Sequence, residues 1–375
     1  MKLAVKTELL KRVLSCTARA ASTKAIQPIL NNVLLSCDKG SLVVFATDLD
    51  LSIECKLPAE VNTPGKITLP AKKLEEIVSK VPGEDVNLSN ETNNTLTKIT
   101  SNKSKFQING ISPEEYPEIL TKNRKDGITI NIDSDYLLKG LSLTLFAATR
   151  YEEQSVLSGI KFVFSGKNLE LAAADGSKIA VYSCSLEEKV EKGEAIIPFR
   201  AVVEIEKLIK TFKENNKSVS ITIFSDVAIF ENNDFTLITR LIDGKYPNYN
   251  NLIPKDLPYE ATFSRLDLLN VLDRVSVLAN EKTCTVKMSL EKKAKTVEVS
   301  AKSNEYGDSK DEIDVKYEGE DLQIAFNYKF LVESLRNLNV DKVTFKLKES
   351  NMPIILNLEE KDFTYTFLLM PVQLR

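Results

Sequence analysis

The sequence contains no histidine among its 375 residues. Catalytic serine and cysteine side chains are commonly activated by an imidazole base, and the HExxH zinc site uses two histidines. Histidine is also the usual general acid or base near neutral pH. This absence therefore excludes Ser-His and Cys-His nucleophile pairs, the HExxH zinc site and histidine acid–base chemistry.

Cysteine is scarce, and its positions follow no metal-binding pattern. The five cysteines are widely spaced and form no CxxC pair. An odd, scattered set argues against a disulfide framework and against a metal site. We expect small core side chains in a reducing compartment; they are Cys16, Cys37, Cys55, Cys184 and Cys284.

Long hydrophobic runs are also missing. No segment approaches the length of a membrane span, and Met1–Val5 leads directly into charged residues without the apolar stretch of a signal peptide. The 43% hydrophobic and 27% charged content is typical of a soluble globular protein. We therefore expect a cytoplasmic protein, and its length favours two or three domains.

Motifs that hold cofactors are absent as well. The sequence has no GxxxxGK, no GxGxxG and no carboxylate cluster with metal-ligand spacing, so we expect no cofactor. Two Ser-x-x-Lys matches, Ser36 to Lys39 and Ser289 to Lys292, leave one enzymatic alternative, a Ser-Lys hydrolase on a duplicated α+β scaffold. Such a serine belongs at a helix start in a cleft, whereas both matches run into predicted hairpin turns.

What the sequence does contain is an internal repeat with a period near 128 residues. A polar residue followed by paired leucines at helical spacing begins at Thr7 and recurs at Ser134 and Ser264. A short strand that leads into a helix at Pro70 recurs at Pro198, 128 residues later, and again at Phe326. Each repeat therefore carries two amphipathic helices.

Between these helices the sequence alternates apolar and polar residues around tight turns. Strand hairpins are predicted over 33–45, 160–173 and 286–299. Two helices packed on antiparallel sheet in each repeat indicate an α+β fold of three repeated domains. We place the boundaries near Asp126 and Pro258, which gives domains 1–126, 127–258 and 259–375.

The net charge of −3 means that nucleic-acid binding would require positive residues gathered on one face. The polar sides of the predicted helices carry such residues. On one helix an ordinary solvated face explains them, but six helices ordered by a repeat favour a shared surface that holds phosphates without sequence specificity. The residues are Lys11, Arg12, Lys72, Lys73, Lys80, Lys139, Arg200, Lys207, Lys210, Lys213, Arg265, Arg274, Lys329 and Arg336.

Several motifs, in order along the whole chain, resemble those of bacterial DNA polymerase III beta subunits, the sliding-clamp family. The most specific are Asp243-Gly244-Lys245-Tyr246-Pro247 and Met370-Pro371-Val372-Gln373-Leu374. Further matches lie at 28–30, 46–49, 67–71, 173–176, 240–249 and 279–282. The threefold repeat and the length agree with this resemblance.

The resemblance implies a non-catalytic processivity factor, in which two copies join head to tail and six domains close a ring around double-stranded DNA. By similarity, Phe106 and Ile108 would meet Val277 and Leu278 of a second copy. The basic residues that would face DNA, without reading its sequence, are Lys11, Arg12, Lys24, Lys72, Lys80, Arg150, Arg200, Lys207 and Arg274.

The resemblance also implies a hydrophobic groove between the second and third domains. In this family the groove accepts a short Gln-led, Leu- and Phe-rich peptide from the polymerase III alpha subunit, the clamp loader delta subunit and other clamp-motif proteins. Carried over position by position, its residues are Leu157, Ala174, Gly176, Ile179, Pro247, Leu252, Asn327, Phe330, Leu368, Met370, Pro371, Val372 and Leu374.

The chain departs from the family pattern at four places. Ser177-Lys178 replaces a common His-Arg, and Gln373 stands where several clamps have arginine, so we expect a less cationic groove. The segment 150–154 is more acidic than usual, and Arg375 follows the usual terminal leucine. A scaffold that binds no nucleic acid is the third alternative, and it predicts no salt-dependent association with DNA.

Overall fold

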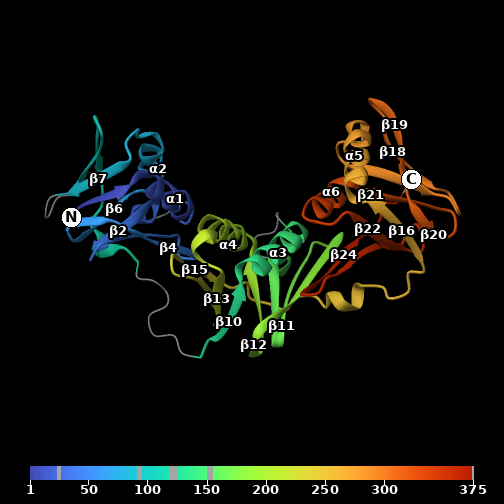
Figure 1. Cartoon of the computed structure of the whole chain (residues 1–375), viewed down its shortest axis with the longest axis horizontal. Coiled ribbons are helices and arrows are strands. Elements are labelled where there is room, and N and C mark those ends of the chain that lie inside the picture. Colours follow the sequence, from blue (N-terminus) through green and yellow to red (C-terminus); the bar gives the residue numbers. More distant parts are fainter. Residues whose placement is uncertain (23–26, 91–94, 118–125, 150–154, 374–375) are drawn as a thin grey trace. The chain divides into compact units, whose positions relative to one another are not determined.

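The computed structural model describes residues 1–22, 27–90, 95–117, 126–149 and 155–373 (Figure 1). The chain divides into two compact units. Unit 1 contains residues 1–138 and 200–241, and unit 2 contains residues 139–199 and 242–375. Each unit therefore contains part of the central repeat.

Six α-helices occur in the described part of the chain, and they begin where the repeat predicts. Ser264 and Asn327 accept hydrogen bonds from backbone N–H groups in the first turns of α5 and α6, which satisfies donors that a helix start leaves free. The helices are α1 Thr7–Thr17, α2 Ala71–Lys80, α3 Ser134–Thr144, α4 Phe199–Phe212, α5 Arg265–Val275 and α6 Tyr328–Arg336.

Unit 1 contains two antiparallel sheets. In it α1 packs beside α2 and contacts β3 and β4 (Figure 1). The first sheet has the order β5 Glu60–Thr63, β1 Lys2–Lys6, β7 Asp85–Asn90, β8 Leu96–Ser101, β9 Ser104–Asn109. The second has the order β10 Ile128–Asp133, β13 Ser218–Ile223, β14 Val227–Glu231, β15 Phe235–Arg240, β4 Leu51–Pro58, β3 Ser41–Thr47, β2 Asn32–Asp38, β6 Gly65–Pro70.

Unit 2 also contains two antiparallel sheets, and α5 packs beside α6. Together with unit 1 this confirms the predicted α+β fold of helices on antiparallel sheet. One sheet has the order β11 Gly159–Ala174, β12 Lys178–Pro198, β24 Phe363–Leu369, β23 Ile354–Glu359, β22 Lys342–Leu347, β16 Tyr259–Ser264, β20 Lys316–Glu318. The other has the order β19 Gly307–Asp314, β18 Thr296–Ser303, β17 Thr285–Leu290, β21 Leu322–Asn327.

Consecutive repeats share a sheet through one recurring strand pairing. β15, the last strand of the central repeat, pairs with β4 of the N-terminal repeat. β24, the last strand of the C-terminal repeat, pairs with β12 of the central repeat. The corresponding strands at the two ends of the series, β9 and β19, are edge strands of their sheets. A sheet edge carries backbone groups that can pair with another strand.

On β2 and β3 the fully buried residues lie on one side of the sheet, as the alternation of apolar residues predicts. Val33 and Leu35 on β2 and Leu42 and Val44 on β3 are fully buried. All five cysteines are buried and free, which confirms that they are core side chains. At the turn predicted near 165–168 the chain forms a single strand, β11, which is interrupted by register shifts on both sides of Gly166 and by its positive φ of 60°. No described helix is long and apolar enough to cross a membrane.

The same turn occurs in the first two repeats. The Asp48 carboxylate accepts hydrogen bonds from the N–H groups of the residues two and three positions later, and Asp175 does the same 127 residues on. The residue after each aspartate has a positive φ, 80° at Leu49 and 84° at Gly176. Glycine adopts this conformation without steric cost, whereas leucine is strained by its Cβ.

We expect Leu49→Gly to raise the free energy of unfolding by about 0.5–1 kcal/mol. The left-handed conformation destabilises the native state by about 1–2 kcal/mol when the residue is leucine. Glycine removes this strain, but its larger conformational entropy in the unfolded chain offsets part of the gain in stability. Urea denaturation of the variant measures the difference. Gly176→Ala is the matched control and should lose about 1 kcal/mol. Lower stability of Leu49→Gly would contradict the strain at this turn.

Candidate functional site

A cluster of buried apolar side chains in unit 2 gathers where β11, β12 and β24 meet the segment after Tyr246. We call it the central apolar cluster. Val156, Leu157, Ile242 and Ile253, which are partly buried, pack against it. Its members are Ala172, Ala174, Ile179, Val181, Ile196, Tyr246, Tyr249 and Leu368.

Four of the predicted groove residues, Leu157, Ala174, Ile179 and Leu368, belong to this cluster or pack on it. Three others are exposed beside the same elements: Gly176 in the turn between β11 and β12, Pro247 after Tyr246, and Leu252 at the end of η6, Tyr249–Leu252. The sequence prediction missed Val181, Tyr246 and Tyr249. The alternation of a strand indicates Val181, because it lies two residues after Ile179 on the same face. The matched segment 240–249 contains Tyr246 and Tyr249.

The segment after β24 is held by two backbone hydrogen bonds. Met370 N–H donates to Ser177 C=O at 2.8 Å, and Val372 N–H donates to Ala325 C=O at 2.7 Å. The Met370 side chain is 40% exposed, although it is large and apolar. Pro371 and Val372 are half-buried, and the predicted groove residue Leu374 lies outside the described residues.

Lys178, one of the departures from the family pattern, is buried beside these residues. Its side chain is 4% exposed, forms an ion pair with Asp175, and lies 3.7 Å above the Phe330 ring centre. A buried ammonium needs such compensation. Asn327, a predicted groove residue, accepts a hydrogen bond from Lys329 N–H and so caps α6.

Two tyrosines make the polar contacts of the central apolar cluster. The Tyr246 hydroxyl accepts a hydrogen bond from Ala174 N–H at 3.0 Å, and burial raises the Tyr246 pKa to about 12. The Tyr249 hydroxyl donates to the Glu170 carboxylate, and burial followed by this acidic neighbour raises the Tyr249 pKa. The two rings pack edge to face with centres 6.2 Å apart. Both tyrosines are thus fixed and neutral at physiological pH.

Several of the predicted DNA-facing residues form ion pairs, hydrogen bonds or ring contacts with other residues of unit 1. Arg200 pairs with Asp48 and donates to Arg19 C=O at 3.1 Å. Lys207 donates to Ser15 C=O, and the Arg12 guanidinium lies 5.2 Å from the Phe212 ring centre. Their charges are therefore shared with neighbouring groups.

Other predicted DNA-facing residues are more open. Lys11 is 3.9 Å from Glu8, a weak surface pair, and Lys72 and Lys80 on α2 are exposed with no ion-pair partner among the described residues. In unit 2, Arg274 pairs with Asp311 at 2.6 Å. Lys24 and Arg150 lie outside the described residues. α2 thus offers the freest positive charges of the predicted set.

The residues predicted to join two copies lie at the free sheet edges. Phe106 and Ile108 alternate with exposed residues along the edge strand β9 and are half-buried. In unit 2, Val277 is 77% exposed and Leu278 is half-buried in η7, Ser276–Leu278, which contacts β19. Apolar side chains beside a free sheet edge are typical of an interface.

The serine sites do not support the hydrolase alternative. Ser36 lies within β2 and Ser289 within β17, and neither begins a helix. Lys292 follows β17 and pairs with Glu320 at 2.7 Å. The described residues contain no group of three His, Cys, Asp or Glu side chains placed to hold a metal ion.

We expect Asp175→Asn to lower the free energy of unfolding by about 3 kcal/mol, because it leaves the buried Lys178 ammonium without a counter-charge. Asparagine keeps the side-chain oxygen that accepts the two turn N–H groups. Lys178→Met should cost only about 1 kcal/mol, since it removes the charge and keeps the apolar stem.

Urea denaturation of both single variants and of the double variant checks this expectation. The double variant should resemble Lys178→Met, because no charge is then left buried. If the two single variants lose the same free energy of unfolding, the ion pair does not determine the stability of this turn.

Comparison with known proteins places the whole chain in one family. Models of the DNA polymerase III beta subunit match the N-terminal domain at residues 1–120, the central domain at 131–248 and the C-terminal domain at 250–373. The chain is 34% identical to the beta sliding clamp of Synechocystis sp., with 100% of both chains covered.

Solved structures agree with this assignment. A DNA polymerase III beta subunit from Thermotoga maritima is 26% identical with a TM-score of 0.89, and a DNA polymerase sliding clamp from Bacillus subtilis is 27% identical with a TM-score of 0.89. Both comparisons cover 100% of each chain. The three matched domains, their order and the shared fold establish that this chain belongs to the DNA polymerase III beta subunit family, the beta sliding clamps.

Proposed function

We propose that this protein is a sliding clamp, a non-catalytic ring that encircles duplex DNA and tethers the replicative polymerase. The observation that carries the proposal is the match of three clamp-domain models, in order, to nearly the whole chain. A topologically linked ring needs only weak, sequence-independent contacts with DNA, so it holds the polymerase while it slides. Catalytic groups and cofactors have no part in this function.

The recurring strand pairing supports closure of the ring by a second copy. Within the chain, the last strand of one repeat pairs with the corresponding strand of the preceding repeat, as β15 does with β4 and β24 does with β12. The same rule pairs β9 of one copy with β19 of another. This contact is heterologous, and two copies closed head to tail satisfy both free edges.

The charge distribution supports a DNA-facing surface made by the helices. Net charge is −3, so attraction to phosphates has to be local. Lys11 on α1 and Lys72 and Lys80 on α2 supply exposed charge, whereas Arg200 and Lys207 bind neighbouring groups in unit 1. We propose that the first set contacts DNA and that the second positions the helices.

We propose the central apolar cluster and the segment 370–374 as the docking groove for partner peptides. Met370 and Leu252 are exposed, and they lie close in sequence to Leu368, a member of the cluster, and to Ile253, which packs against it. Exposed and buried apolar side chains in this combination suit a Leu- and Phe-rich peptide. The partners would be the polymerase III alpha subunit, the clamp loader delta subunit and other clamp-motif proteins. Because Lys178 is engaged by Asp175, the groove offers little positive charge.

We also propose a cytoplasmic location, because bacterial chromosomal DNA lies in the cytoplasm and the relatives are bacterial. The proposed domain boundaries stay near Asp126 and Pro258. Asp126 falls between the first two matched ranges, whereas the third range begins at residue 250, before Pro258.

Ile108→Asp on β9 is expected to open the ring. A carboxylate on the apolar side of this strand would be buried without a partner in the proposed interface. The solution mass should fall from about 84 kDa, twice the 42.0 kDa chain mass, to that of one chain.

The variant should also lose retention on circular DNA, whereas the unchanged protein should stay on circles until they are linearised. Gln107→Glu, at the exposed neighbouring position, is the control and should keep both properties. A protein that leaves circular DNA as fast as linear DNA would not be a sliding clamp.

Met370→Ala is expected to weaken binding of a Gln-led, Leu- and Phe-containing peptide about 5- to 30-fold. Truncation of a well-packed contact residue typically costs about 1–2 kcal/mol of binding free energy. Fluorescence anisotropy of a labelled peptide measures the affinity, and the solution mass should not change.

Leu266→Ala is the control, because Leu266 on α5 is also a large exposed apolar residue, at 60%, but lies outside the cluster. It should bind the peptide as the unchanged protein does. Equal affinity of Met370→Ala and the unchanged protein would contradict the groove assignment.

A further inference from the structure

Lys178 is a buried cation within the proposed groove segment, between Gly176 and Ile179, and two groups compensate its charge. The Asp175 carboxylate forms an ion pair with the ammonium, which also lies 3.7 Å from the centre of the Phe330 ring. The Lys178 side chain is 4% exposed and the Asp175 side chain is 15% exposed. A ligand in the groove therefore meets a buried pair without net charge.

The Asp175 carboxylate is held in place by the turn that contains it. One carboxylate oxygen accepts hydrogen bonds from the N–H groups of Ser177 and Lys178, at 3.0 and 3.1 Å, and the other oxygen accepts from the Lys178 ammonium. The pair is thus fixed before any ligand arrives. A peptide carboxylate would have to displace Asp175 to reach the ammonium, and breaking a buried pair is costly.

The N-terminal repeat uses the same aspartate in the same way, although its cation comes from another element. Asp48 occupies the place of Asp175 in the shared turn, and Leu51 occupies the place of Lys178. Asp48 pairs instead with Arg200, at the start of α4. Two cations from different elements are therefore neutralised by an aspartate at one position of the repeat.

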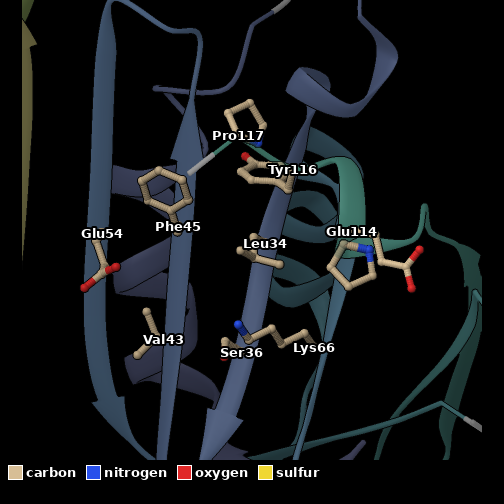
Figure 2. A pocket seen from close by; sticks show the side chains of 10 residues that line it. Leu34, Ser36, Val43, Phe45, Glu54, Lys66, Glu114, Tyr116 and Pro117 are labelled. Carbon is tan, nitrogen blue, oxygen red and sulfur yellow. The ribbon is translucent and has the colours of Figure 1, made fainter. Parts of the chain in front are cut away.

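Charges on the outer sheet face of the N-terminal repeat are not balanced in this way (Figure 2). Glu54, Lys66 and Glu114 line a pocket of about 400 Å³ there. None of the three forms an ion pair with another described residue, and Lys66 and Glu114 are exposed. Neutralisation of a cation is thus a property of the turn and not of the sheet face as a whole.

The other lysines close to the groove residues in sequence add little net charge. A hydrogen bond with the Cys284 thiol and, more weakly, the Glu281 carboxylate raise the pKa of Lys329, which places its ammonium toward the loop before β17. Lys245 is exposed, and so is the opposite charge of Asp243 two residues earlier. The pairing at the turn therefore decides whether the groove presents a net positive charge.

We propose that Asp175 makes the groove indifferent to the charge of its peptide, so that partners are selected by their glutamine and apolar side chains and not by an acidic residue. This inference rests on the proposed docking groove. Asp175 acts through Lys178, as a positioning residue that holds the ammonium away from the peptide. A groove with a free basic side chain would favour acidic segments instead.

Two peptides that differ only in charge test the proposal. They are acetyl-Gln-Leu-Asn-Leu-Phe-amide and acetyl-Gln-Leu-Asp-Leu-Phe-amide, and each competes with one labelled peptide for the full-length protein. We expect the unchanged protein to bind the two with affinities within about twofold of each other. Lys178→Met leaves the Asp175 charge without its partner, so it should bind the acidic peptide about 3- to 10-fold more weakly than the neutral one.

Asp175→Asn should change the ratio in the opposite direction, with the acidic peptide bound about 3- to 10-fold more tightly than the neutral one. This preference should shrink in about 0.5 M salt, because the attraction is electrostatic. The double variant has neither charge and should bind both peptides alike. A purely structural role of the pair would lower both affinities without opposite changes in their ratio.

Glu320→Gln is the matched control, since it removes the carboxylate that pairs with Lys292 and follows β20, the opposite edge strand of the sheet. It should bind both peptides like the unchanged protein. A preference above threefold in the unchanged protein, or ratios that change in the same direction in both single variants, would overturn the inference alone. If the unchanged protein binds neither peptide, the docking groove is wrong and the inference fails with it.

Discussion

Backbone hydrogen bonding between repeats is the constraint on which this structure depends. A strand at a sheet edge exposes donors and acceptors that need partners. β15 completes the sheet of the N-terminal repeat, and β24 completes that of the central repeat. The pairing rule leaves one free edge at β9 and one at β19. The same interaction that joins domains in one chain therefore supplies the proposed contact between chains.

Electrostatics divides the basic residues into two groups. Arg19 pairs with the buried carboxylate of Glu204, and Lys207 reaches Ser15 C=O, so these residues fix α1 against α4. Lys72 and Lys80 stay exposed on α2. A basic side chain that already forms an ion pair or hydrogen bond binds a phosphate with less favourable free energy, because that contact must first be broken. In our proposal, helix positioning and DNA attraction are thus carried by different residues of similar type.

Outward-facing apolar residues occur at equivalent places in two repeats, with different outcomes. In the central repeat Tyr249 covers the surface and extends the central apolar cluster toward Leu368. In the N-terminal repeat Phe45 and Tyr116 border a pocket with a half-buried Glu54. Duplication preserved the sheet and the turn at Asp48 and Asp175, while substitutions on the outer face changed what each surface can accept.

The sequence by itself determined the repeat, the six helices and most strands, because these follow from local periodicity and capping residues such as Ser264. It also placed Ile179, Leu368 and Met370 in one candidate site through the family resemblance. Tertiary structure alone decided that the Lys178 ammonium lies over the Phe330 ring, that Arg200 pairs with Asp48, and that the outer edges of β9 and β19 have no strand partner among the described residues. The two side-chain contacts join residues far apart in the chain, and local sequence patterns carry no information on such long-range contacts.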